Sequence, residues 1–196
     1  MKIAAFLDRD GTLNVEKGYI DNLDNLELIP GAAQAVRRLN DAGILAILTT
    51  NQTGAARGYY NEEHILALNA KVQSLLKEQA GAWLDAVFYC PHYDKGTVAP
   101  YNIDCDCRKP ACGMIEAACK QFPDIDKSRS FVLGDKATDV EFGHQAGCKS
   151  ILLKTGYGER VLSGEYQTLE RQPDYVCDSI VEAIDCIMQV ASAARS

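Results

Sequence analysis

Two carboxylates stand two residues apart, directly after a short apolar stretch. Residues 2–7 are typical of a strand that is buried on both faces of a parallel sheet. Asp8 and Asp10 follow this strand, and Gly11 then allows a sharp turn. Because side chains i and i+2 of an extended chain point to the same side, both carboxylates should face one site. The repulsion between them favours a bound divalent cation over the alternative of a solvated turn.

A second group of residues is suited to a different metal. The stretch of residues 90–109 has no helical or strand periodicity and contains three cysteines and one histidine. Three thiolates and one imidazole complete a tetrahedral site for structural Zn²⁺, and thiolates disfavour Mg²⁺. Four unrelated side chains are the alternative, but an aperiodic loop of this length needs something to order it. The four expected zinc ligands are Cys90, His92, Cys105 and Cys107.

The charge balance of the chain limits its partners. The sequence has 20 basic and 27 acidic residues, a net charge of −7, and no basic run, so we expect no nucleic-acid partner. A chain of this charge that handles phosphate must concentrate its cations locally. Arg108 and Lys109 form one such cluster, and Lys136 is another cation of this kind. Zinc bound at Cys107 would fix the backbone that aims Arg108 and Lys109.

Length and hydropathy predict one domain, residues 1–196, in the cytoplasm. The composition, 47% hydrophobic and 24% charged, is typical of soluble globular proteins. No apolar run approaches the roughly 20 residues of a membrane span, and the chain begins with a strand rather than a charged leader. We therefore expect no membrane association, and we expect a monomer.

Strand-like and helix-like segments alternate along the chain. This alternation predicts a central parallel sheet covered by helices on both faces, a three-layer α/β fold. The expected strands are residues 2–7, 44–48, 86–89, 130–133, 150–153 and 175–176. The expected helices are residues 33–42, 62–80, 114–122, 139–146 and 180–191.

The motif Asp-x-Asp-Gly-Thr at residues 8–12 resembles the first motif of the haloacid dehalogenase (HAD) superfamily of phosphotransferases. The resemblance implies a Rossmann-like fold in which Asp8 is the nucleophile, forming an aspartyl-phosphate, and Asp10 is the general acid and base. It also implies that Thr50 and Lys109 stabilise the phosphoryl group. Asp8, Asp10 and Asp135 would then bind Mg²⁺.

Further stretches are similar to one family within this superfamily, the heptose 1,7-bisphosphate 7-phosphatases. The stretches that carry this resemblance are residues 8–12, 18–19, 50–54, 56–58, 90–92, 105–110, 113–114 and 134–136. The resemblance implies a sugar bisphosphate substrate and a product, heptose 1-phosphate, used in lipopolysaccharide or related glycan synthesis. The substrate-binding residues that it implies are Glu16, Lys17, Gly18, Tyr19, Thr50, Asn51, Gln52, Thr53, Arg108, Lys109 and Lys136.

The insertions are too short for a cap domain over the site. Only about 17 residues separate Thr12 from Pro30, and the other insertion is the proposed zinc loop. We therefore expect an open site whose selectivity comes from loops. Two alternatives remain: a histidinol-phosphate phosphatase, which shares the first motif and the metal loop, and a non-catalytic zinc-bearing interaction domain. The chain from about residue 157 onward carries no motif that assigns it a role.

Overall fold

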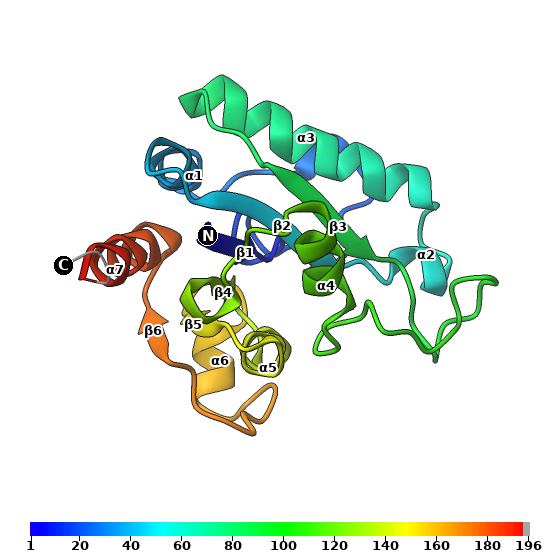
Figure 1. Cartoon of the computed structure of the whole chain (residues 1–196). Helices are drawn as coiled ribbons and strands as arrows, with labels where there is room; N and C mark the ends of the chain where they lie inside the picture. The colour runs from blue at the N-terminus through cyan, green and yellow to red at the C-terminus, as the bar shows by residue number, and fades with distance from the viewer. Residues whose placement is uncertain (194–196) are drawn as a thin grey trace.

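Six parallel strands form one central sheet in the computed structural model, which describes residues 1–193. The strand order is β3-β2-β1-β4-β5-β6, so β1 lies in the interior of the sheet between β2 and β4 (Figure 1). The bounds are β1 Ala4–Leu7, β2 Leu45–Asn51, β3 Ala86–Cys90, β4 Phe131–Gly134, β5 Lys149–Leu153 and β6 Tyr175–Cys177. The chain order reverses beside β1, and ligands bind at the carboxyl ends of strands at such a point.

Helices cover both faces of the sheet, which confirms the three-layer α/β prediction. Helices α1, α3 and α7 pack on one face, and α4 and α5 pack on the other (Figure 1). The helices are α1 Ala32–Asp41, α2 Gly54–Arg57, α3 Glu62–Ala80, α4 Gly113–Gln121, α5 Ala137–Ala146, α6 Gly158–Leu162 and α7 Ile180–Ala193. Two 3-10 turns, η1 Leu23–Asn25 and η2 Lys127–Arg129, complete the secondary structure.

The two helical layers explain why β1 is apolar at every position. Leu7 packs into the core beneath α1, α3 and α7, whereas Phe6 packs into the core beneath α4 and α5. Both side chains are completely buried. A strand in this position must be hydrophobic on both faces, and this rigid strand presents Asp8 at its carboxyl end.

Local signals set the ends of α3 as the sequence predicts. The side chain of Asn61 accepts a hydrogen bond from the backbone N–H of His64, 3.0 Å away, which caps the first turn. Gly81 ends the helix with φ of 61°, a conformation that a residue with a side chain rarely adopts.

The structure differs from the predicted elements at several points, of which those near the carboxyl edge of the sheet matter most. Strand β2 continues to Asn51, because Thr50 and Asn51 pair with β3, so Thr50 lies within the strand and not after it. Helix α5 begins at Ala137, where Lys136 and Asp139 form its capping box. The short helices α2 and α6 were not predicted, since four or five residues carry no helical periodicity.

No large insertion covers the carboxyl edge of the sheet. Residues 8–31 contain only η1, and residues 91–112 contain no helix or strand. Among the described residues, no helix is long and apolar enough to cross a membrane.

Candidate active site

Three buried carboxylates meet at the carboxyl ends of β1 and β4. Asp8 follows β1, Asp135 follows β4, and Asp139 lies in the first turn of α5. One oxygen from each carboxylate lies within 4.8 Å of one oxygen from the other two. The motif resemblance implies Asp8 and Asp135 as magnesium ligands and Asp139 as a second acid that orients Lys136 or a metal-bound water, and the structure brings all three carboxylates together.

Lys109 supplies the positive charge beside these carboxylates. Its Nζ lies 2.8 Å from Oδ1 of Asp8 and 2.5 Å from Oδ1 of Asp139. Burial by itself lowers the pKa of Lys109, but the two carboxylates outweigh burial and raise the pKa above its usual value. The side chain therefore stays an ammonium ion, as stabilisation of a phosphoryl group requires.

Asp135 fits the role of a ligand for a divalent cation. Its Oδ2 accepts a hydrogen bond from the backbone N–H of Tyr157, 2.8 Å away. Its buried Oδ1 makes no hydrogen bond with the described residues, but Nζ of Lys136 lies 3.3 Å from it as an ion-pair partner. Burial, with the neighbouring charges of Asp8 and Asp139, raises the pKa of Asp135 to about 7, although Lys136 opposes the shift. Clustered carboxylate oxygens that repel one another suit Mg²⁺, which prefers oxygen ligands.

The carboxylate of Asp10 does not belong to this group, although we expected it as a magnesium ligand. Its oxygens accept hydrogen bonds from Arg9 at 3.0 Å and from Asn14 and Gln52 at 2.9 and 2.8 Å. Burial alone raises the pKa of Asp10, but Arg9 and these hydrogen bonds hold it below its usual value. Arg9 is fully buried, so the motif residue between the two aspartates orients Asp10 away from the cluster.

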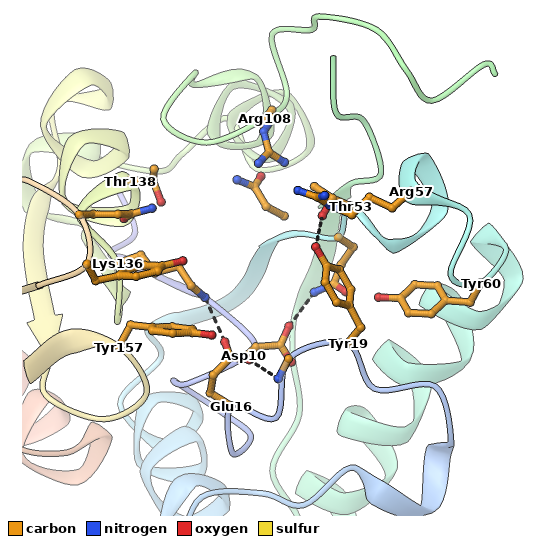
Figure 2. A pocket seen from close by; sticks show the side chains of 15 residues that line it. Asp10, Glu16, Tyr19, Thr53, Arg57, Tyr60, Arg108, Lys136, Thr138 and Tyr157 are labelled. Atoms are coloured by element: carbon orange, nitrogen blue, oxygen red, sulfur yellow. Dashed lines mark hydrogen bonds and ion pairs between the residues drawn. The ribbon is translucent and has the colours of Figure 1, made fainter. Parts of the chain in front are cut away.

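A cavity of about 270 Å³ opens beside this cluster (Figure 2). Asp10 and Glu16 lie on one side of it, and the guanidinium groups of Arg57 and Arg108 lie across from them. Among the described residues, neither arginine forms a salt bridge. Two guanidinium groups without a carboxylate partner favour an anionic ligand at that side.

Most of the predicted substrate-binding residues line the cavity, but Lys17 does not. Its Nζ lies 3.2 Å from Oε2 of Glu27 and 3.0 Å from the carbonyl oxygen of Asn25. Lys17 instead lines an adjoining cavity of about 600 Å³ that shares Glu16, Gly18 and Tyr157 with this one, so its role in substrate binding stays a prediction. Neighbouring side chains of one loop point to different sides, and the sequence alone did not show which of residues 16–19 face this cavity. The predicted residues that line this cavity are Glu16, Gly18, Tyr19, Asn51, Gln52, Thr53, Arg108 and Lys136.

The polar residues at the end of β2 fix other groups in place. Gln52 donates to both Asp10, at 2.8 Å, and Thr50, at 2.9 Å. The side chain of Asn51 bonds in both directions with the backbone of Lys109, at 3.0 and 3.1 Å. Asn51 thus joins β2 to the loop that carries Lys109. Thr50 and Lys109 line a smaller cavity together with Asp8 and Asp10.

The predicted zinc ligands also come together. Sulfur atoms of the three cysteines lie 3.1, 3.3 and 3.5 Å apart, and Nδ1 of His92 lies 3.3 Å from the sulfur of Cys107. A hydrogen bond with Cys90, with His92 also contributing, lowers the pKa of Cys107 to about 5, so a thiolate is present at neutral pH. The ligands of a tetrahedral zinc site with Zn–S bonds of about 2.3 Å lie about 3.8 Å apart. The cluster fits zinc with a small expansion.

Curated relatives decide the family. The chain is 51% identical over 187 residues, 94% of each chain, to the D-glycero-D-manno-heptose-1,7-bisphosphate 7-phosphatase of Thermosynechococcus vestitus. It is 42% identical to the D-glycero-beta-D-manno-heptose-1,7-bisphosphate 7-phosphatase of Haemophilus influenzae, covering 93% of this chain and 95% of the relative. The chain belongs to the heptose-1,7-bisphosphate 7-phosphatase family.

Two further comparisons agree with this family. The model of a family described as HAD-hydrolase-like matches residues 106–183. The crystal structure of the D,D-heptose 1,7-bisphosphate phosphatase of B. bronchiseptica, complexed with magnesium and phosphate, has a TM-score of 0.82 and 30% sequence identity. The match covers 96% of this chain and 99% of that one. The recognition drawn from the motifs is therefore confirmed.

Several cavity residues of this family member were given no role from the sequence. Arg57 lies in the stretch 56–58 that resembles the family, so that resemblance pointed to it. Tyr157 and Tyr166 stack with ring centroids 4.3 Å apart, and they bring the C-terminal part of the chain, which matched no motif, to the cavity wall. The cavity residues that sequence analysis left unassigned are Arg57, Tyr60, Thr138, Tyr157, Tyr166 and Gln167.

Proposed function

We propose that the protein removes the 7-phosphate of D-glycero-D-manno-heptose 1,7-bisphosphate, releasing phosphate and heptose 1-phosphate. One observation carries this proposal: the cavity places Asp10 and Lys136 on one side and two guanidinium groups without carboxylate partners on the other. A sugar with a phosphate at each end would place one phosphate beside Lys136 and the other beside the two guanidinium groups. The names of the family relatives support the same substrate.

In the proposed mechanism, Asp8 attacks the phosphorus atom in line and forms an aspartyl-phosphate. The ammonium of Lys109 and the hydroxyl of Thr50 stabilise the phosphoryl oxygens. Asp10 protonates the leaving sugar oxygen and then takes a proton from the water that hydrolyses the intermediate. Its pKa is low in the free site, and an arriving phosphate dianion raises this pKa and favours the proton that the first step needs.

We propose that Mg²⁺ is held by Asp8 and Asp135, with Asp139 beside it. When bound, Mg²⁺ neutralises the charge of the phosphoryl oxygens. The closeness of the three buried carboxylates and their mutual repulsion support this site. The magnesium in the B. bronchiseptica structure supports it as well.

We also propose Zn²⁺ as a structural ion in the cluster of Cys90, His92, Cys105 and Cys107. The softness of three thiolates supports this choice of metal. The chain as a single domain, its monomeric state and its location in the cytoplasm stay predictions. The single sheet that joins all six strands supports the first of these.

A histidinol phosphate fits the cavity less well. That substrate carries a cationic amino group, whereas the far side of the cavity presents Arg57 and Arg108. Besides Asp10, the acidic residue that lines the cavity is Glu16, and its carboxylate is already paired with Lys136 at 3.2 Å and with the backbone N–H of Gly18 at 2.7 Å. Like charges therefore oppose this substrate.

Phosphate release from both anomers of heptose 1,7-bisphosphate and from histidinol phosphate, with and without Mg²⁺, tests the proposal. We expect magnesium-dependent release of one phosphate from the bisphosphate and at least about tenfold lower kcat/KM for histidinol phosphate. Activity on neither substrate would favour a non-catalytic zinc-bearing domain, and preference for histidinol phosphate would overturn the substrate assignment.

A further inference from the structure

The two cavity arginines come from separate parts of the chain but contact the same aromatic ring. Arg57 lies at the end of α2, and Arg108 follows the last cysteine of the metal-binding loop. The guanidinium carbon of Arg57 lies 4.3 Å from the ring centroid of Tyr93, and that of Arg108 lies 5.1 Å from it. Tyr93 does not line the cavity itself. It contacts the two residues that do.

The backbone around Tyr93 holds the ring in place. The N–H of Tyr93 donates to the carbonyl of Tyr101 at 3.0 Å, and its own carbonyl accepts from Gly96 at 2.8 Å. The next residues of the loop, Thr97 and Val98, donate to the carbonyl of Ala56 at 2.8 and 3.1 Å. This contact fixes the loop to α2 directly beside Arg57.

Gly96 makes this docking possible. A Cβ atom at position 96 would lie 2.5 Å from the carbonyl oxygen of Ala56, closer than real contacts allow. The metal-binding loop and α2 therefore meet backbone to backbone. His92, which precedes Tyr93, lies in the cysteine cluster, so the ring is fixed from both sides along the chain.

An aromatic ring suits the electrostatics of the arginine pair. Two guanidinium groups that face one cavity without a carboxylate partner repel each other. The negative face of an aromatic ring attracts a guanidinium without neutralising it, so both charges stay available for an anion. The carbonyl of His92 adds a hydrogen bond to Arg108 at 3.3 Å, whereas the buried Nε of Arg57 has no partner among the described residues. Among the described residues, the guanidinium of Arg57 contacts two aromatic rings, Tyr93 and, at 6.0 Å, Tyr19, and forms no salt bridge or side-chain hydrogen bond.

We infer that Tyr93 is a positioning residue that holds Arg57 and Arg108 together as the subsite for the phosphate that is not transferred. The inference rests on the proposed function. The ring is the active feature, since the hydroxyl of Tyr93 makes no hydrogen bond with any described residue. Phenylalanine at this position keeps the platform, and leucine removes it with a small change in volume.

Steady-state kinetics of Tyr93→Leu and Tyr93→Phe on heptose 1,7-bisphosphate and on heptose 7-phosphate, which lacks the second phosphate, test this. We expect Tyr93→Leu to lower kcat/KM for the bisphosphate by about tenfold, mainly through KM, and to leave the monophosphate within about twofold. Tyr93→Phe should match the wild type on both substrates. An equal loss on both substrates, or a loss in Tyr93→Phe, overturns the inference.

Two controls separate this result from other causes. Zinc content is measured on each variant, and a defect in Tyr93→Leu that coincides with loss of zinc overturns the inference. Calorimetric binding of mannose 1-phosphate without added magnesium does not depend on turnover. We expect about tenfold weaker binding in Tyr93→Leu alone, in line with the loss of two cation–π contacts. If the wild type hydrolyses neither heptose phosphate, the proposed function fails. The binding comparison then still tests Tyr93, because equal affinities of the wild type and both variants for mannose 1-phosphate overturn its positioning role.

Discussion

The ammonium of Lys109 lies 2.8 Å from Oδ1 of Asp8, and both side chains are almost fully buried. The contact joins the end of the central strand to a loop that is 101 residues away in the sequence. It orients the carboxylate that we propose as nucleophile, and it places a positive charge beside it in a site with two other carboxylates nearby. The same ammonium is then in place to stabilise the phosphoryl group that Asp8 accepts.

Asp8→Asn should abolish phosphate release while the fold is retained. The amide occupies the same space and can still accept a hydrogen bond from Lys109, but it is not a nucleophile. We expect kcat to fall by about 10³-fold or more, with an unchanged circular dichroism spectrum. The exposed Asp94→Asn serves as the control and should have wild-type activity. Substantial turnover by Asp8→Asn would assign the nucleophile elsewhere.

Lys109→Met should lower both activity and stability. Removal of the ammonium leaves Asp8 and Asp139 buried without their cation, which costs about 3–5 kcal/mol in the free energy of unfolding. Urea unfolding in magnesium-free buffer measures this loss. The exposed Lys95→Met should change the free energy by less than about 0.5 kcal/mol. A Lys109→Met variant as stable as the wild type would show that the carboxylates do not need this cation.

Asp135 makes the stability of the magnesium-free protein depend on pH. Its pKa is about 7 in the folded protein, against 3.8 as the ordinary value, so between these values the folded state holds a proton that the unfolded chain has lost. Stability therefore decreases as the pH rises through this window. We expect Asp135→Asn to melt at a higher temperature than the wild type at pH 8, with the difference shrinking toward pH 5.

Magnesium should reverse this order at pH 8, because it binds and stabilises only the wild type. Thermal melting of both proteins, with and without added magnesium, provides the measurement. A constant difference between the two proteins from pH 5 to pH 8 would contradict the raised pKa. An order that magnesium leaves unchanged would contradict the role of Asp135 as a ligand.

Cys107→Ser should reduce both zinc content and activity. We expect one zinc per wild-type chain by elemental analysis and a large loss in the variant, because serine is a poor ligand for zinc. Activity should fall with it, since Arg108 and Lys109 follow this cysteine directly. Cys119→Ser, outside the cluster, should keep both. A zinc-free preparation with full activity would show that the metal is not needed to position Arg108 and Lys109.

Lys136 lines the cavity and Lys17 does not, so the same substitution at the two positions tests which lysine binds the substrate. Lys136→Met should reduce kcat/KM strongly, because its ammonium lies 3.3 Å from Asp135 and lines the cavity. Lys17→Met should stay within about twofold of the wild type, since its partner is the exposed Glu27 and an exposed ion pair contributes little. Equal losses in the two variants would show that Lys17 also binds the substrate.

The sequence by itself determined the layout of the protein. Periodicity and caps defined the strands and the longer helices, because these signals act within one or two helical turns. The spacing of Cys90, His92, Cys105 and Cys107 was enough to group them, since all four lie in one loop. The motif after β1 indicated a phosphate site at the carboxyl edge of the sheet for the same local reason.

The tertiary structure decided which side chains share that site. Buried Arg9 binds the carboxylate of Asp10, so the carboxylate cluster consists of Asp8, Asp135 and Asp139 and does not include Asp10. Tyr157 and Tyr166 line the cavity, although neither belongs to a motif that the sequence showed. Local sequence fixes dihedral angles over a few residues, but the direction of a side chain depends on charges and packing partners that only the folded sheet brings within reach.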